Sequence, residues 1–88
     1  MYDYKTLEQK LNAVITDVGP RLFATDAHDI REFITAVEYG LAFDLLCHAL
    51  LQGHHPVTAE AYTLINELGR EMELDPRTWE PIKPLIAR

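Results

Sequence analysis

The 88-residue chain has little cysteine and little positive charge: Cys47 is its one cysteine, and eight lysines and arginines stand against fourteen aspartates and glutamates. A single cysteine excludes an internal disulfide and is typical of a reducing compartment, so we expect a cytoplasmic protein. The net charge of −6 argues against direct binding to nucleic acid, because phosphate contacts need clustered lysine and arginine. The basic segment and apolar run of a secretory signal are also missing.

Other signals of known structure or chemistry are missing too. No apolar run reaches the roughly 20 residues that span a bilayer, so we predict no membrane segment. No segment alternates polar and apolar residues as a strand does. Glycine-rich phosphate loops and serine nucleophile motifs are absent. We therefore predict a protein that is not an enzyme, has no cofactor and acts by binding a partner.

The chain does contain a strongly apolar stretch, residues 40–52, in which the polar side chains Asp44, His48 and Gln52 recur every four residues. On an α-helix these three share one narrow stripe. A helix that is apolar on all other sides must be surrounded by other elements. We therefore predict an all-α domain over residues 1–88, in which four main helices and a short C-terminal helix form a small bundle around residues 40–52. Gly53 is expected to end this helix in the left-handed conformation.

Three further helices are predicted by capping residues and by apolar residues three and four apart. The first begins at Asp3 or Thr6 and ends at Gly19-Pro20, the second begins at Thr25 or Asp26, and the fourth begins at Thr58. A tight turn at 38–40 makes the second and third helices neighbours.

Several single residues carry further expectations about packing. Leu22 and Phe23 are expected to pack on the core. Gly69 is expected to allow the close approach of another helix. Asp75-Pro76 begins the short C-terminal helix, which carries Trp79; this residue is expected in the core, and the alternative is a contact residue at the surface.

The histidines and the cysteine do not form a recognisable site. Asp44 and His48 have the spacing of two ligands on a helix, but no second such pair exists, so no metal site is predicted. Cys47 lies on the apolar side of the central helix, where a free cysteine behaves as a small hydrophobic residue. His54 and His55 follow that helix in a loop, and the sequence assigns them no role.

The acidic residues are concentrated around the central helix. Residues 22–55 contain five acids and Arg31 as their one lysine or arginine. The simplest explanation is a solvated surface. The functional one is a docking surface for a basic protein, since opposite charges speed the encounter and select the partner. Tyr39 would add an aromatic anchor. The predicted partner-binding residues are Asp29, Glu32, Glu38, Tyr39 and Asp44.

A set of residues in the second, third and fourth helices and near the C-terminus forms a distinctive pattern: Phe33, Ile34, Glu38, Tyr39, Leu41, Ala42, Leu46, Cys47, Tyr62, Ile65, Leu68, Gly69, Met72 and Trp79. Through these residues, roughly residues 25–82 resemble the MafI-like immunity proteins, small acidic proteins encoded beside polymorphic bacterial toxins, including those of contact-dependent growth inhibition systems. This chain departs from the pattern at Val37, where glycine is expected, and at Phe43, where an acid is commoner.

The resemblance implies a cytoplasmic inhibitor that binds and neutralises one cognate toxin domain. Many such toxins are nucleases, often RNases that cut transfer RNA. An acidic helical surface would occupy the basic site where the RNA lies, or a neighbouring site. The alternative is a helical regulatory or adaptor module that binds a partner helix in an apolar groove.

Overall fold

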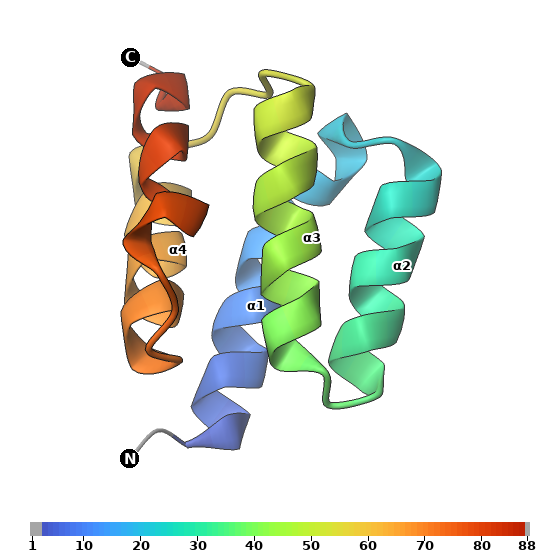
Figure 1. Ribbon diagram of the computed structural model, residues 1–88. Helices are drawn as coiled ribbons and strands as arrows, with labels where there is room; N and C mark the ends of the chain where they lie inside the picture. The colour runs from blue at the N-terminus through green and yellow to red at the C-terminus, as the bar shows by residue number, and fades with distance from the viewer. Residues whose placement is uncertain (1–2, 88) are drawn as a thin grey trace.

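The computed structural model describes residues 3–87 and confirms the all-α fold (Figure 1). Residues 1, 2 and 88 of the predicted domain lie outside this part. The α-helices are α1 (Tyr4–Val18), α2 (Ala24–Thr35), α3 (Tyr39–Gln52) and α4 (Ala59–Glu71), and the 3-10 segments are η1 (Gly19–Arg21), η2 (Pro76–Thr78) and η3 (Glu80–Leu85). The described residues form no strand, although a parallel bridge joins Val57 and Ile86.

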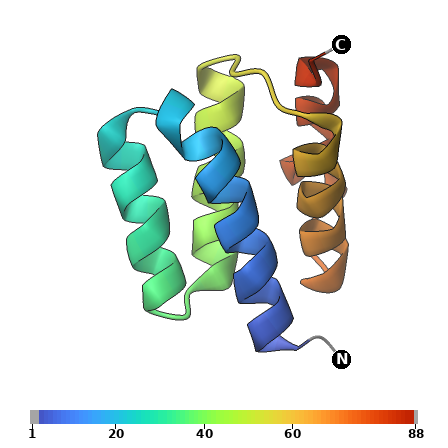
Figure 2. The same cartoon turned by 180° about the vertical axis from the view of Figure 1, so that it is seen from behind.

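α3 is the central helix, as the apolar stretch predicted. It stands between α2 on one side and η2 and η3 on the other, and α1 runs behind it; Figure 2 shows α1 in front when the molecule is turned. Phe43, Leu46 and Leu50 are completely buried on α3. The stripe of Asp44, His48 and Gln52 is exposed. The fourth helix packs on α1 and on the C-terminal segments.

Three predicted caps are present. The Asp3 side chain accepts from the Lys5 backbone N–H, that of Thr58 from Ala61, and that of Asp75 from Arg77. The predicted C-terminal helix is broken into η2 and η3, because the proline rings of Pro81 and Pro84 do not fit a regular α-helix.

The start of α2 differs from the prediction. The N-cap is Phe23, with no side-chain hydrogen bond, so Thr25 and Asp26 lie inside the helix and do not cap it. Leu22 is buried, but Phe23 is 75% exposed. The reason is local, because Leu22 and Phe23 are both extended, and neighbouring side chains of extended backbone point to opposite sides.

The left-handed residues also differ from the expectation. Gly53 has φ −87° and is right-handed, while the next residue, His54, has φ 49°. The tight turn between α2 and α3 is present, and it contains Val37 at φ 63°. A β-branched residue in this region is a genuine outlier.

Trp79 is in the core, as predicted, and it explains Gly69. A Cβ atom on Gly69 would lie 2.4 Å from two indole carbons, so the close approach is made by a ring from the C-terminal segments and not by another helix. The indole N–H donates to Asn66 Oδ1 at 2.9 Å. The ring also meets Phe43 edge-on, with centroids 6.0 Å apart.

Candidate protein-binding surface

The carboxylates that are neutralised by lysine or arginine all lie away from α2 and α3. Asp17 pairs with Arg21 at 3.0 Å and Asp75 with Arg77 at 2.7 Å, while Lys10 of α1 bridges Glu67 and Glu71 of α4. The Lys10 ammonium has a raised pKa, because both glutamates stabilise its charge. Asp75 has a lowered pKa, because Arg77 donates hydrogen bonds to it.

The predicted site acids have no such partners. Asp29, Glu38 and Asp44 form no ion pair with any of residues 3–87, and Glu32 pairs only with the exposed His28, at 3.3 Å. The segment from α2 to α3 therefore carries most of its negative charge uncompensated. Such a surface attracts a basic partner over distances near the Debye length, about 8–10 Å at physiological salt.

On α2, Asp29 lies on the flank away from α1. The guanidinium of Arg31 reaches Gly19, 3.2 Å from the position that a Cβ would take there. Each residue advances about 100° around an α-helix. Asp29 and the half-buried Phe33 are each two residues from Arg31 and therefore lie on the opposite side of α2 from it. Glu32 is turned further outward. Asp29 and Phe33 therefore border the side on which α3 is exposed.

On α3, the exposed residues have a definite order. Phe43 faces Trp79 of the C-terminal segments. Around the axis of α3, at about 100° per residue, Asp44 is the next exposed side chain after Phe43, and His48 and Leu41 follow. Leu45 lies beyond them, on the side of α2. Asp44 and Asp29 therefore lie on opposite sides of an apolar strip made by Leu41 and Leu45. Of the other two predicted acids, Glu32 is turned outward from α2, and Glu38 is the N-cap residue of α3.

Tyr39 does not lie on the surface as an aromatic anchor. It is 7% exposed, and its ring lies 6.1 Å from that of Tyr4. Burial raises the pKa of the Tyr39 hydroxyl, with smaller contributions from Glu8 and Tyr4. The interpretation of Tyr39 as an interface anchor is therefore wrong in its geometry.

Two aliphatic residues that the sequence analysis did not select are exposed instead. Val37 is 60% exposed and Leu41 is 50% exposed. Leu41 lies seven residues before His48, on the stripe assigned to polar residues, and this spacing is the signal that identifies it.

A hollow of about 280 Å³ opens where the start of α1, the α2–α3 turn and the end of α4 meet; we call it the terminal hollow. It is lined by Tyr4, Leu7, Val37, Glu38, Tyr39, Gly40, Met72 and Leu74. A Cβ atom on Gly40 would meet nothing within 4 Å, so the helix backbone borders open space there.

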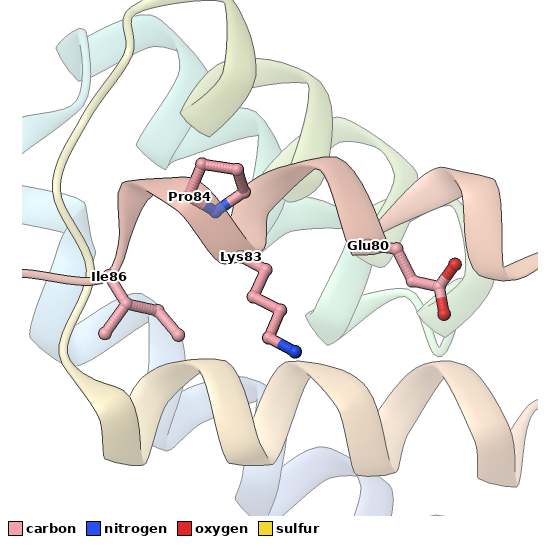
Figure 3. Close-up of a pocket in the computed structure, with 4 residues that line it drawn as sticks. All are labelled: Glu80, Lys83, Pro84 and Ile86. Carbon is pink, nitrogen blue, oxygen red and sulfur yellow. The ribbon is translucent and has the colours of Figure 1, made fainter.

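A second hollow of about 480 Å³ lies along η3 and is shown in Figure 3. Its lining is Glu80, Lys83, Pro84 and Ile86, with the Lys83 side chain directed toward α4. The pKa of Tyr62 on α4 is raised by burial and by the Glu80 carboxylate. The opposite charges of Glu80 and Lys83 give this hollow no preference for a charged partner of one sign.

Chemistry at Cys47 is disfavoured by its position. The side chain is buried, and burial, with a smaller effect of Asp44, raises the thiol pKa well above its usual range. The reactive species of cysteine is the thiolate, so a group held protonated is a poor nucleophile.

A search of residues 3–87 finds no three His, Cys, Asp or Glu side chains placed to hold a metal ion. Over the same residues, no helix has the length and apolar character needed to cross a membrane.

No protein-family model, curated protein or solved structure matches the chain. The resemblance to MafI-like immunity proteins therefore rests only on the residues given in the sequence analysis.

Proposed function

We propose that this chain is a cytoplasmic, non-catalytic immunity protein that binds and neutralises a basic toxin domain of a contact-dependent growth inhibition system, such as an RNase that cuts transfer RNA. One observation carries the proposal. Among residues 3–87, Asp29, Glu38 and Asp44 have no ion-pair partner, and the same α2–α3 segment exposes the apolar side chains of Val37 and Leu41. An apolar centre with a charged rim is the usual anatomy of a protein interface.

The sign of the charge supports a basic partner. A nuclease must be basic where its nucleic acid lies, since phosphate binding depends on lysine and arginine. Uncompensated carboxylates on a rigid helical hairpin would speed encounter with such a surface and disfavour acidic competitors. Helices held by a packed core also lose little conformational freedom on binding.

A second candidate is a helical adaptor that binds an amphipathic partner helix, and the exposed Val37 and Leu41 favour it. Salt separates the two functions. Binding through ionic contacts weakens steeply as salt rises, because exposed charges are screened. Binding of an apolar helix face depends little on moderate salt.

The direct test is co-expression with candidate toxin domains and measurement of cell growth and complex affinity. Reversing Glu38 and Asp44 to lysine should remove protection and slow association more than tenfold, because the potential that steers the partner changes sign. Circular dichroism should show an unchanged helical signal.

The matched control reverses Glu60 and Glu80, which are also exposed and form no ion pair among residues 3–87. This variant has the same net charge but an intact α2–α3 surface, and it should protect as the original does. Wild-type affinity in the Glu38→Lys, Asp44→Lys variant would exclude this surface.

A further inference from the structure

The terminal hollow has room for a side chain of a partner. Its volume is about 280 Å³, just below the roughly 300–1,000 Å³ of small-molecule pockets. Tyr4 and Val37 at its edge are 61% and 60% exposed, and Met72 and Leu74 are half-buried within it. An apolar group placed here would cover surface that the fold leaves in contact with water, which is favourable.

The one charged residue in the lining of the hollow is a carboxylate. Glu38 lines it, and Glu8 is near enough to act on the Tyr39 hydroxyl. Neither carboxylate has an ion-pair partner among residues 3–87. An occupant that brought lysine or arginine beside its apolar group would therefore meet opposite charge, whereas an acidic occupant would be repelled.

Val37 gives a second reason to regard this edge as a contact. It holds a left-handed conformation at φ 63°, which is unfavourable for a branched residue and easily adopted by glycine or asparagine. The strained residue presents an apolar side chain to the hollow. Strain of this kind is often found at functional sites.

We propose that the terminal hollow receives one apolar side chain from a basic segment of a partner protein, so that it acts as the anchor pocket of the interface. The inference rests on the proposed protein-binding function and adds the chemistry of the contact. The pocket takes a leucine-like side chain, and Glu38 and Glu8 take the lysine or arginine beside it.

Three short peptides with blocked ends test the recognition without knowledge of the natural partner. The first has the core Arg-Leu-Lys, the second replaces its leucine by alanine, and the third replaces both basic residues by glutamate. Each is titrated at millimolar concentration into isotope-labelled protein, and amide NMR shifts are followed. The first peptide should shift the amides of residues 37–40 and of Leu74.

Binding of the alanine peptide should be about tenfold weaker, because most of the buried apolar area is lost, and the glutamate peptide should not bind. Equal affinity for the first two peptides, shifts centred elsewhere, or no shift with any peptide would overturn the proposal.

Two variants show whether the hollow itself is the site. Gly40→Leu places a side chain in the open space beside the α3 backbone, without a clash at Cβ, and should abolish peptide binding without lowering the melting temperature. Thr63→Leu is the matched control, because it adds an exposed leucine to α4 outside the residues that line the hollow. Retained binding in Gly40→Leu would contradict the proposal.

These experiments can exclude the anchor pocket and the immunity function independently of each other. If Gly40→Leu still neutralises the toxin but charge reversal at Glu38 and Asp44 does not, the anchor pocket is excluded and the immunity function is supported. If the hollow binds the peptide but the protein protects against no co-expressed toxin, the anchor pocket is supported and the immunity function is excluded.

Discussion

Gly40 and Gly69 are both helical glycines, but their surroundings differ. A Cβ on Gly40 meets nothing within 4 Å, whereas a Cβ on Gly69 lies 2.4 Å from the Trp79 ring. Glycine costs a helix interior about 1 kcal/mol relative to alanine. Gly→Ala should therefore gain about that amount at Gly69, and somewhat less at Gly40, which is in the first turn of α3. Only Gly69 also experiences overpacking, which typically costs about 1–3 kcal/mol.

We therefore expect opposite effects from the same substitution. Gly40→Ala should stabilise the protein by about 0.5–1 kcal/mol. Gly69→Ala should lower stability by a net amount of up to about 2 kcal/mol, because the indole is fixed by its bond to Asn66 and cannot easily move. Thermal unfolding followed by circular dichroism measures both. An equal rise in melting temperature for the two variants would show that the ring adjusts freely.

Cys47 should make stability depend on alkaline pH. Its folded-state pKa is raised by burial from the ordinary value of 9.0. The folded chain therefore holds this proton more tightly than the unfolded chain, and the contribution to stability is complete below pH 9.0 and is lost as pH rises above it. The expected slope is about 1.4 kcal/mol per pH unit.

Urea unfolding at several pH values checks this slope, and the readout is the difference between the original chain and Cys47→Ala. Cys47→Ala should not show the loss of stability that the original chain shows just above the ordinary pKa of the thiol, whatever the absolute stability of the variant. Identical slopes in the two proteins would show that the thiol titrates normally in the fold.

At the scale of elements, the α2–α3 turn is short and contains one strained residue. α2 ends at Thr35 and α3 begins at Tyr39, and Val37 between them has φ 63°. Val37→Asn should stabilise the protein by about 0.5–1 kcal/mol, because asparagine tolerates this conformation better than a branched residue. The midpoint of chemical denaturation measures the change. A drop in stability would mean that contacts of the valine side chain outweigh the strain.

The elements themselves were largely predictable from the sequence. Apolar spacing identified the four α-helices, and Asp3, Thr58 and Asp75 cap as expected. The turn residues were less predictable, because the position of a left-handed residue depends on the tertiary path. His54 takes the conformation expected at Gly53, and Val37 takes one for which sequence preference gives no support.

The surface was predictable in charge but not in geometry. The excess of acids in residues 22–55 is visible in the sequence. The rotation of α2 and α3 about their own axes decides which of these acids are neighbours. For α3, one contact that fixes the rotation is between Phe43 and Trp79, which are far apart in the sequence. Tyr39 was misplaced for the same reason, since its partner Tyr4 comes from α1.

At the scale of the whole molecule, the negative charge is unevenly distributed. Among residues 3–87, the acids paired with lysine or arginine lie on α1, on α4 and at the N-cap of η2, whereas residues 22–55 carry five acids against Arg31 alone and none of these acids pairs with lysine or arginine. A basic partner should therefore approach with the α2–α3 side foremost. The terminal hollow lies at one end of this side, where Val37 and Glu38 belong to the turn.

The one tryptophan of the chain lies in the interior with its ring against Phe43 and Gly69, while the terminal hollow is lined by two tyrosines and no tryptophan. The fluorescence of this tryptophan therefore depends on the packing of the core. Indole emission would therefore report melting of the bundle, so a fluorescence trace would identify a variant that has lost its fold.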